Sequence, residues 1–391
     1  MNEGRPGAAR ATLAGLCASL VGVGLARFAY TPLIPALIAA AWFTPAQAAY
    51  IGAVNLAGYL AGALSGRRIA GAIGARSVLR GMMVVASVAF FACSGPLSFL
   101  WFLVWRFAAG LAGGILMVLA APSVLPLVSP ARRGLASGLI FTGVGLGIAA
   151  SGTLVPLLLS AGLTETWCGL GALASVLTLF AWTSWPSRSN VRTARPEFRR
   201  DEPGSHPALR ALYVEYGLNA VGAVPHMVFL VDFVARGLNR GLEAGAVYWL
   251  VFGVGAVAGA LLTGSAADRV GFRAMLRLAF VVQAIGSLVL AFAPEPFALG
   301  AASLVLGAFV PGVVPLVLGR VQELTPGDSG AQQAGWSFAT AAFALGQAIA
   351  AYGFSFLFAR GTGYPTLFVL GAAAMLLALA IDFAFAHREE T

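Results

Sequence analysis

Residues 58–64 read GYLAGAL, and residues 255–261 read GAVAGAL, 197 positions further along the chain. Other residues recur at similar offsets: Gly24, Leu25 and Pro32 as Gly217, Leu218 and Pro225, and Pro122 and Pro126 as Pro311 and Pro315. An internal repeat with a period of about half the chain predicts two halves with the same fold.

The composition indicates that both halves lie in a membrane. Hydrophobic residues make up 59% of the 391 residues and charged residues 10%, whereas soluble domains carry about 25% charged residues. Apolar stretches of about 20 residues, long enough to cross ~30 Å of hydrocarbon, recur along the sequence. They predict an all-α polytopic membrane protein with twelve transmembrane helices, near residues 12–39, 46–65, 77–95, 98–121, 134–159, 166–185, 209–234, 244–264, 274–293, 297–319, 333–358 and 365–385.

A repeated half inside such a protein is typical of transporters, whose two bundles open a central site to one side of the membrane and then to the other. The segment 186–208 is polar, charged and interrupted by prolines, which predicts a cytoplasmic linker. We therefore expect an N-terminal six-helix bundle (1–185), this linker, and a pseudo-symmetric C-terminal six-helix bundle (209–391).

All 24 basic residues are arginines, and their positions predict the orientation of the chain. With the N-terminus in the cytoplasm, nineteen arginines lie on the cytoplasmic side. Only Arg236, Arg240 and Arg360 lie outside, and Arg27 and Arg106 fall within spans. This positive-inside bias predicts that both termini lie in the cytoplasm. We expect the protein in a bacterial-type inner (plasma) membrane. Because the positive charge follows the loops of a membrane protein, we expect no nucleic-acid partner.

Residues 264–273 read GSAADRVGFR and follow the eighth predicted span on the cytoplasmic side. Gly264 and Gly271 permit a tight turn, Asp268 can pair with a basic residue or cap a helix, and Arg269 and Arg273 favour the cytoplasmic interface. The segment resembles the signature loop of the major facilitator superfamily. In the first half the equivalent loop, GRRIAGAIGAR at 66–76, has Gly and Ala where the signature has Asp and Arg.

Two further segments carry the same resemblance. Residues 106–113, RFAAGLAG, resemble a second signature of the superfamily, a membrane-embedded arginine followed by glycines, which the family associates with the transport path and sometimes with proton coupling. Residues 25–35, LARFAYTPLIP, and 55–60, NLAGYL, resemble the YbfB-like branch. The resemblance covers essentially the whole chain and implies the twelve-helix fold of the superfamily and a transporter role.

Charged residues inside the spans are the first candidates for a binding site, because a charge there costs at least ~2.5–3.5 kcal/mol. Arg27 lies ~22 Å into the first span, and Tyr30 and Thr31 lie on the same side of that helix. Pro32 and Pro35 can interrupt the backbone hydrogen bonds there and free carbonyl groups.

A second group lies along the seventh span. Its residues have the spacing i, i+4, i+7 and i+11: Glu215, Asn219, Gly222 and His226. This spacing predicts one polar stripe ~16 Å long. Such a stripe is unfavourable against lipid, so we expect it to face the space between the two halves.

Together these residues suggest a site for a small organic anion. We expect Arg27 and Arg106 to bind its acidic group, and Tyr30, Asn55, Asn219 and His226, with Thr31 beside them, to orient it. Either Glu215 or His226 would carry a coupling proton; histidine suits this role because its unperturbed pKa is about 6.5.

Structural alternatives stay open for each residue. Arg27 or Arg106 would be a static brace if Glu215 or backbone carbonyls held it. Glu215 would be partly solvated if it lay near the cytoplasmic surface, and His226 would serve the fold alone if it satisfied a carbonyl. We expect two further acids near span ends to be interfacial, Asp232 and Asp382.

Other functions also stay open, namely efflux of neutral or cationic drugs or metabolites, and a non-transporting sensor built on a transporter fold. A Walker motif requires lysine, which the chain lacks, and neither His-Glu-x-x-His nor a clustered set of metal ligands occurs. We therefore expect no enzymatic activity, cofactor or metal. The expected partners are a small-molecule substrate, membrane lipids and protons, and the protein is expected to be a monomer.

Overall fold

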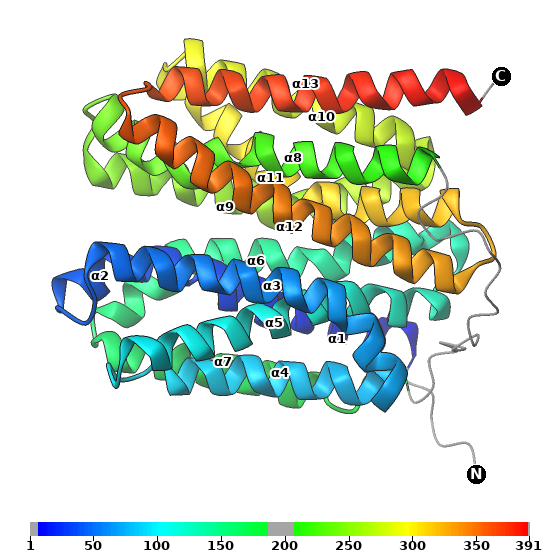
Figure 1. Cartoon of the computed structure of the whole chain (residues 1–391), viewed down its shortest axis with the longest axis horizontal. Coiled ribbons are helices and arrows are strands. Elements are labelled where there is room, and N and C mark those ends of the chain that lie inside the picture. The colour runs from blue at the N-terminus through cyan, green and yellow to red at the C-terminus, as the bar shows by residue number, and fades with distance from the viewer. Residues whose placement is uncertain (1–6, 187–206, 390–391) are drawn as a thin grey trace. The chain divides into compact units, whose positions relative to one another are not determined.

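The computed structural model describes residues 7–186 and 207–389, and every regular element in these ranges is a helix (Figure 1). Within them, twelve helical segments are long and apolar enough to cross a membrane. This confirms the predicted all-α class and the twelve spans. The chain divides into two compact units, Met1–Glu197 and Phe198–Thr391. Residues 187–206 of the predicted linker lie outside the described residues.

The N-terminal unit contains six spans, built from α1 (Ala8–Ser19), the π-helical η1 (Leu20–Phe28) and α2 (Tyr30–Ala39), then α3 (Pro45–Ile73), α4 (Ala75–Ala92), α5 (Phe99–Val124), α6 (Arg133–Leu159) and α7 (Leu163–Ala181). Two 3₁₀ turns connect α5 to α6, Leu125–Leu127 and Pro130–Arg132. Helix α3 begins with a capping box, in which Thr44 and Gln47 satisfy each other's backbone N–H groups.

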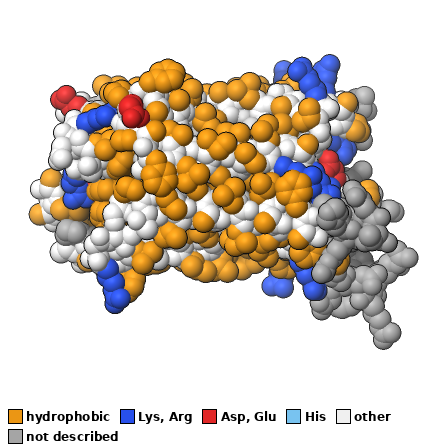
Figure 2. Space-filling view, turned by 90° about the horizontal axis from the view of Figure 1, so that it is seen from above, with side chains coloured by type: hydrophobic (Ala, Val, Ile, Leu, Met, Phe, Trp, Pro, Cys, Tyr) orange, Lys and Arg blue, Asp and Glu red, His pale blue; other side chains and the backbone are white. Residues whose placement is uncertain are grey.

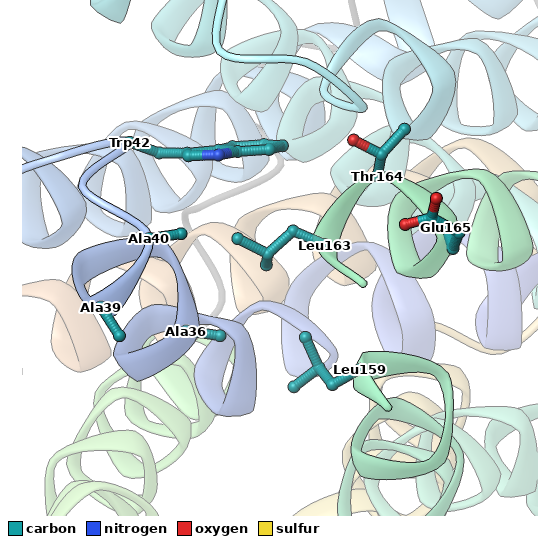
Figure 3. Close-up of a pocket in the computed structure, with 8 residues that line it drawn as sticks. All are labelled: Ala36, Ala39, Ala40, Trp42, Leu159, Leu163, Thr164 and Glu165. Carbon is teal, nitrogen blue, oxygen red and sulfur yellow. The ribbon is translucent and has the colours of Figure 1, made fainter. Parts of the chain in front are cut away.

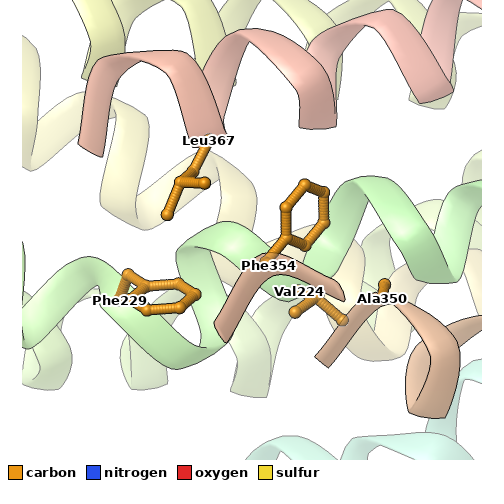
Figure 4. Packing of buried hydrophobic residues seen from close by; sticks show 5 residues of the cluster. All are labelled: Val224, Phe229, Ala350, Phe354 and Leu367. Atoms are coloured by element: carbon orange, nitrogen blue, oxygen red, sulfur yellow. The ribbon is translucent and has the colours of Figure 1, made fainter. Parts of the chain in front are cut away.

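The C-terminal unit repeats this order with α8 (Pro207–Asp232), the π-helical η4 (Phe233–Gly237), α9 (Gly241–Val270), α10 (Phe272–Phe292), α11 (Pro296–Leu324), α12 (Ser329–Ala359) and α13 (Tyr364–Glu389). Apolar side chains from three of these helices pack together in Figure 4: Val224 and Phe229 of α8, Ala350 and Phe354 of α12, and Leu367 of α13. Since all five are buried, this cluster holds α12 and α13 against α8.

The first span departs from the sequence-based expectation. It begins at Ala8 rather than near residue 12, and its hydrogen-bond pattern changes in η1, before Pro32 and Pro35 rather than at them. Pro35 lies inside α2 without ending that helix. π-Helical segments are rare and are frequent at functional sites. This one contains Arg27.

The repeat is visible at equivalent turns. Gly74 ends α3 with φ 87°, and Gly271 ends α9 with φ 89°. The N–H of each glycine donates to a carbonyl four residues earlier, Ala70 or Ala267, at 2.9 Å in both cases. Positive φ is strained for other residues, so glycine is required at both positions.

Glycines also set the closest helix contacts within each unit. A Cβ at Gly58 or Gly62 of α3 would collide with backbone carbonyls of α5, and one at Gly255 or Gly259 of α9 would collide with those of α11. Small residues allow this approach in a bilayer, where no hydrophobic effect drives helix association. The repeated segments 58–64 and 255–261 are therefore the packing faces of α3 and α9.

The surface fits insertion in a bilayer. In Figure 2, hydrophobic side chains cover the middle of the helices, and arginine and acidic side chains gather near the helix ends. Large apolar side chains are well exposed on the spans, including Leu179 (71%), Phe292 (71%) and Leu157 (68%). Exposure of this kind is costly in water but favourable in hydrocarbon.

The packing of α3 on α5 gives a stability prediction. Gly58→Ala should lower the free energy of unfolding by about 1–3 kcal/mol, because its methyl group overlaps the carbonyl oxygen of Phe107. Gly81→Ala in α4 is the matched control, since nothing lies within 4 Å of a Cβ there. Thermal unfolding of the purified protein in detergent measures both. Equal midpoints for the two variants would contradict this account of the packing.

Candidate functional site

The N-terminal unit buries an arginine in its interior. Arg106 of α5 is 2% exposed. Its Nη1 donates to the carbonyl oxygen of Ala26 in η1 at 2.7 Å, and its guanidinium carbon lies 4.5 Å from the ring centroid of Tyr30. The aromatic face and the carbonyl both favour a cation at this point. The first span thus supplies two of the groups that hold the Arg106 side chain of the fourth span.

The side chains around Arg106 are themselves held by backbone groups. The Tyr30 hydroxyl donates to the carbonyl of Ala48 at 2.8 Å, and Asn55 Nδ2 donates to the carbonyl of Arg106 at 2.9 Å. Both side chains are buried. These bonds join α2, α3 and α5, so the orientation of the Tyr30 ring and of the Arg106 backbone is defined by three helices.

Arg27 lies in η1 against two aromatic rings. Its guanidinium carbon is 5.3 Å from the ring centroid of Phe28 and 5.8 Å from that of Tyr59. Tyr59 is buried and was not predicted as a site residue. Its position four residues after Asn55 on the same face of α3 was the signal in the sequence.

The structure does not bring Thr31 into this group. The Thr31 side chain is exposed, unlike that of its neighbour Tyr30. Tyr30 and Thr31 are adjacent in α2 and point about 100° apart, so the face that turns Tyr30 toward Arg106 turns Thr31 outward.

The N-terminal unit is almost free of acidic residues. Over residues 7–186 the only acid is Glu165, in the first turn of α7. Within this part of the chain Arg106 forms no ion pair, and its buried Nε has no hydrogen-bond partner. The carbonyl of Ala26 is a partial brace of the kind considered from the sequence, but no carboxylate of residues 7–186 lies beside the positive charge.

In the C-terminal unit, Glu215, Asn219 and His226 of α8 are all buried, at 3%, 2% and 0% exposed. Asn219 Nδ2 lies 3.3 Å from Gln283 Oε1 of α10 and 3.2 Å from Met375 Sδ of α13. At Asn219 the predicted stripe therefore contacts neighbouring helices of its own unit.

Gly222 has a packing role. A Cβ at this position would come within 2.6 Å of Met375 Cε and 2.7 Å of the carbonyl of Gly371 on α13. Gly222 and Asn219 thus pack against α10 and α13 of their own unit, and their orientation toward the space between the halves stays a prediction. Gln283 and Met375, absent from the prediction, could not be found because only the tertiary fold places them beside α8.

His226 differs from Asn219 in having no polar neighbour. Neither ring nitrogen has a hydrogen-bond partner among the described residues. The imidazole lies 5.9 Å from the ring of Phe252, which stacks on Trp249 with centroids 5.0 Å apart. A buried polar group left unpaired costs about 1–3 kcal/mol. Among the described residues, His226 therefore does not satisfy a carbonyl, which was the structural alternative for this residue.

Glu215 borders a cluster of charges. It lines a small pocket with Arg273 of α10, Arg320 of α11 and Asp382 of α13. Asp382 pairs with Arg273 Nε at 3.2 Å and also with Arg277 Nε. Asp382 was expected at the membrane interface, but it is buried, at 6% exposed, because the two arginines enclose it. Glu215 is likewise buried rather than solvated.

The signature loop belongs to the same end of the C-terminal unit. Asp268 and Arg269 lie in the last turn of α9, and Gly271 turns the chain into α10. The Phe272 N–H donates to Glu323 Oε1 of α11 at 3.4 Å. Through these contacts and Arg273, the loop is tied to α11 and α13 of its own unit. At the other end, the predicted interfacial acid Asp232 pairs with Arg236 and accepts a 2.6 Å hydrogen bond from the Tyr364 hydroxyl.

Twelve apolar helices in two repeated units, the signature loop and a buried arginine on the fourth span define a transporter of the major facilitator superfamily. The chain belongs to the family described as "Uncharacterised MFS-type transporter YbfB", which matches residues 19–383. Membership implies transport rather than catalysis. A comparison with curated protein sequences gives no significant match.

Solved structures show the same fold at low sequence identity. The proton:xylose symporter XylE, bound to 6-bromo-6-deoxy-D-glucose, is 14% identical with a TM-score of 0.77, over 97% of this chain and 95% of that chain. The human organic anion transporter MFSD10 (TETRAN) is 16% identical with a TM-score of 0.73, over 96% of this chain and 100% of that chain. FucP in the outward conformation is 16% identical with a TM-score of 0.70, over 95% of this chain and 97% of that chain. At these identities the likeness is one of fold.

The charge cluster gives a second stability prediction. Asp382→Asn should destabilise the protein by about 1–3 kcal/mol, less than the loss of a fully buried partner, because Arg273 and Arg277 are about one-quarter exposed. Asp232→Asn is the control, since its partner Arg236 is 72% exposed and such pairs contribute about 0–1 kcal/mol. Thermal unfolding compares the two, and an equal or larger loss for Asp232→Asn would refute the assignment.

Proposed function

We propose that this transporter carries a small organic anion whose acidic group pairs with Arg106, with Arg27 as the second cation. The observation that carries the proposal is the buried Arg106 guanidinium, held over Tyr30 in a unit whose described residues include one acid, Glu165, at the start of a different span. A charge buried in this setting costs free energy, and pairing with a substrate carboxylate would offset that free energy.

The chemistry of the group favours an anion over a neutral substrate. A guanidinium presents its N–H groups in a planar fork that matches a carboxylate, and Arg106 already has Nη1 bound to the Ala26 carbonyl. Tyr30 and Asn55 would act as positioning residues, since one lies under the guanidinium and the other holds the Arg106 backbone. Binding at Arg106 would then bias the exchange between the two open states of the transporter.

For the C-terminal unit we propose a role for His226, and a smaller one for Asn219, in contacting the substrate. His226 has two unpaired ring nitrogens that can donate or accept. Asn219 has its amide nitrogen beside Gln283 and Met375, which leaves its carbonyl oxygen for a ligand. Thr31 is omitted because its side chain is exposed.

We also propose proton coupling, with Glu215 or His226 as the carrier. Protonation of Glu215 would remove one negative charge from a pocket that also holds Arg273, Arg320 and Asp382. Two proteins with this fold, XylE and the E. coli FucP, are proton symporters of sugars. The same proposal places the protein in an inner membrane, with this charge cluster and both termini on the cytoplasmic side. It also assigns a gating role to the signature loop and takes the protein to be a monomer.

One observation favours the alternative of a cationic substrate. The N-terminal unit has an open surface pocket of about 600 Å³, lined by Trp42 and Glu165 together with Ala36, Ala40, Leu159 and Leu163 (Figure 3). An aromatic ring and a carboxylate are the groups that bind an organic cation. Both side chains are at least partly exposed, which weakens the attraction. We therefore rank this alternative second.

The proposal predicts that Arg106→Gln lowers uptake of the anionic substrate by about 10- to 100-fold, the loss of a charge-assisted hydrogen bond of about 1.5–3 kcal/mol. Thermal-shift screening of small carboxylates, sugars and amines identifies the ligand, and uptake into proteoliposomes measures the variant. Arg236→Gln, an exposed arginine, is the control. Undiminished uptake by Arg106→Gln and by Arg27→Gln, or stabilisation by amines alone, would overturn the anionic site.

Proton coupling predicts a different pattern. The variant that removes the proton carrier, Glu215→Gln or His226→Gln, should abolish substrate accumulation driven by a pH gradient. Substrate exchange at equal pH should continue in that variant, because exchange needs no net proton movement. Both are measured in the same proteoliposomes with labelled substrate. Full gradient-driven accumulation in both variants would exclude these residues as carriers.

A further inference from the structure

We infer that the open pocket of the N-terminal unit binds a small organic cation, an ammonium ion with short apolar substituents, at a site separate from Arg106. Trp42, between α2 and α3, supplies an aromatic ring, and Glu165 of α7 supplies a carboxylate. In Figure 3 the Thr164 hydroxyl and the Glu165 carboxylate point into the space that the Trp42 ring borders. Ring faces and carboxylates both attract such a cation, whatever substrate the protein transports.

Glu165 is a negative charge without a basic partner in the part of the chain that the structure describes. It is the only acid of residues 7–186, and none of the described arginines pairs with it. The lining of the pocket contains no basic residue, and Leu159 of the pocket lies about 39 Å along α6 from Arg133. A cationic ligand would therefore meet an uncompensated carboxylate.

Buried packing holds the two sides of the pocket. The Trp42 ring packs edge-on against Phe102, with the centroids 6.2 Å apart. The Phe102 ring is buried and also contacts Trp167, two residues after Glu165, at 6.0 Å. Ala41, immediately before Trp42, has a φ of 57°, which an alanine adopts only at an energetic cost. The ring and the carboxylate are thus placed before a ligand binds, which favours binding.

The C-terminal unit has the same turns without the same side chains. The residue before Trp42 and its counterpart Asn239 both have positive φ, 57° and 54°. Arg240 then takes the place of Trp42. Glu165 and Tyr364 each follow a glycine of positive φ by three residues, so a tyrosine takes the place of the acid. The turns therefore require neither the aromatic ring nor the carboxylate, and a ligand explains the pair better than the fold does.

The pocket lies near Arg106 but shares no residue with the groups that hold it. Phe102, which contacts Trp42, is one helical turn before Arg106 on α5. The Ala26 carbonyl and the Tyr30 ring hold the guanidinium, and neither residue lines the pocket. Binding in the pocket can therefore be tested independently of the anionic substrate proposed for Arg106.

Saturation-transfer NMR of the full chain in dodecyl maltoside tests the site, with choline and its neutral isostere 3,3-dimethylbutan-1-ol as probes. Choline should bind more tightly than the alcohol. Glu165→Gln and Trp42→Leu should each weaken choline binding by about 2- to 5-fold, the effect of an exposed ion pair or cation–π contact. Trp42→Phe should keep most of the binding, which separates loss of the aromatic ring from altered packing.

Two further variants serve as controls. Glu243→Gln removes an exposed acid from the first turn of α9, as Glu165→Gln does from α7, and should leave choline binding unchanged. Arg106→Gln should also leave choline binding unchanged, so a failure of the proposed anionic site and a failure of this pocket give different results.

Four results would overturn the inference: equal affinity for choline and the alcohol, unchanged choline affinity in both Glu165→Gln and Trp42→Leu, an equal loss in Glu243→Gln, or loss of choline binding in Arg106→Gln. The first would show that charge is not recognised, the next two that binding lies elsewhere, and the last that the two sites are one. Displacement of choline by added phosphatidylethanolamine would support the site and identify a lipid headgroup, rather than a soluble cation, as the source of the ammonium group.

Discussion

A positive charge buried with no carboxylate beside it among residues 7–186 is the constraint on which the N-terminal half depends. Arg106 can lie in the interior of α5 only because η1 presents the Ala26 carbonyl and α2 presents the Tyr30 ring. Those two groups are placed in turn by the bonds of Tyr30 and Asn55 to α3 and α5. The local winding of the first span is thus coupled to the position of one guanidinium. The residual electrostatic cost of that charge is what makes an anionic ligand favourable.

The two halves are alike where backbones meet and unlike where charges lie. Gly74 and Gly271 make the same turn, and the glycines of α3 and α9 make the same close contacts with α5 and α11. In the N-terminal half the buried Arg106 and the half-buried Arg27 lie beside aromatic rings. In the C-terminal half the charges form a compensated cluster of Glu215, Asp382 and the arginines beside them. A common scaffold therefore carries different electrostatics, as a transporter needs if substrate binding and coupling are to be separate functions.

The fold could be predicted almost entirely from the sequence, because long apolar segments, half-chain repetition and glycines at turns are local or periodic signals. The buried site was only partly predictable. Arg106 and Tyr30 were identified by their chemistry within a span, but Tyr59, Gln283 and Met375 become neighbours only through tertiary packing. Thr31 is exposed although its neighbour Tyr30 is buried, because adjacent helical positions point about 100° apart. The neighbours of Asn219 and Gly222 were not predicted, because periodicity shows which residues share a face and not which helix covers that face.

The central claim is that Arg106 recognises the acidic group of the substrate, and a thermodynamic cycle tests it most directly. Binding of the carboxylate ligand and of its uncharged primary amide is measured by calorimetry for the unmodified protein and for Arg106→Gln. If Arg106 binds the acidic group, the two changes are not additive and the coupling free energy is at least about 1.5 kcal/mol. A coupling of zero, with the acid and the amide equally affected by the substitution, would contradict the account.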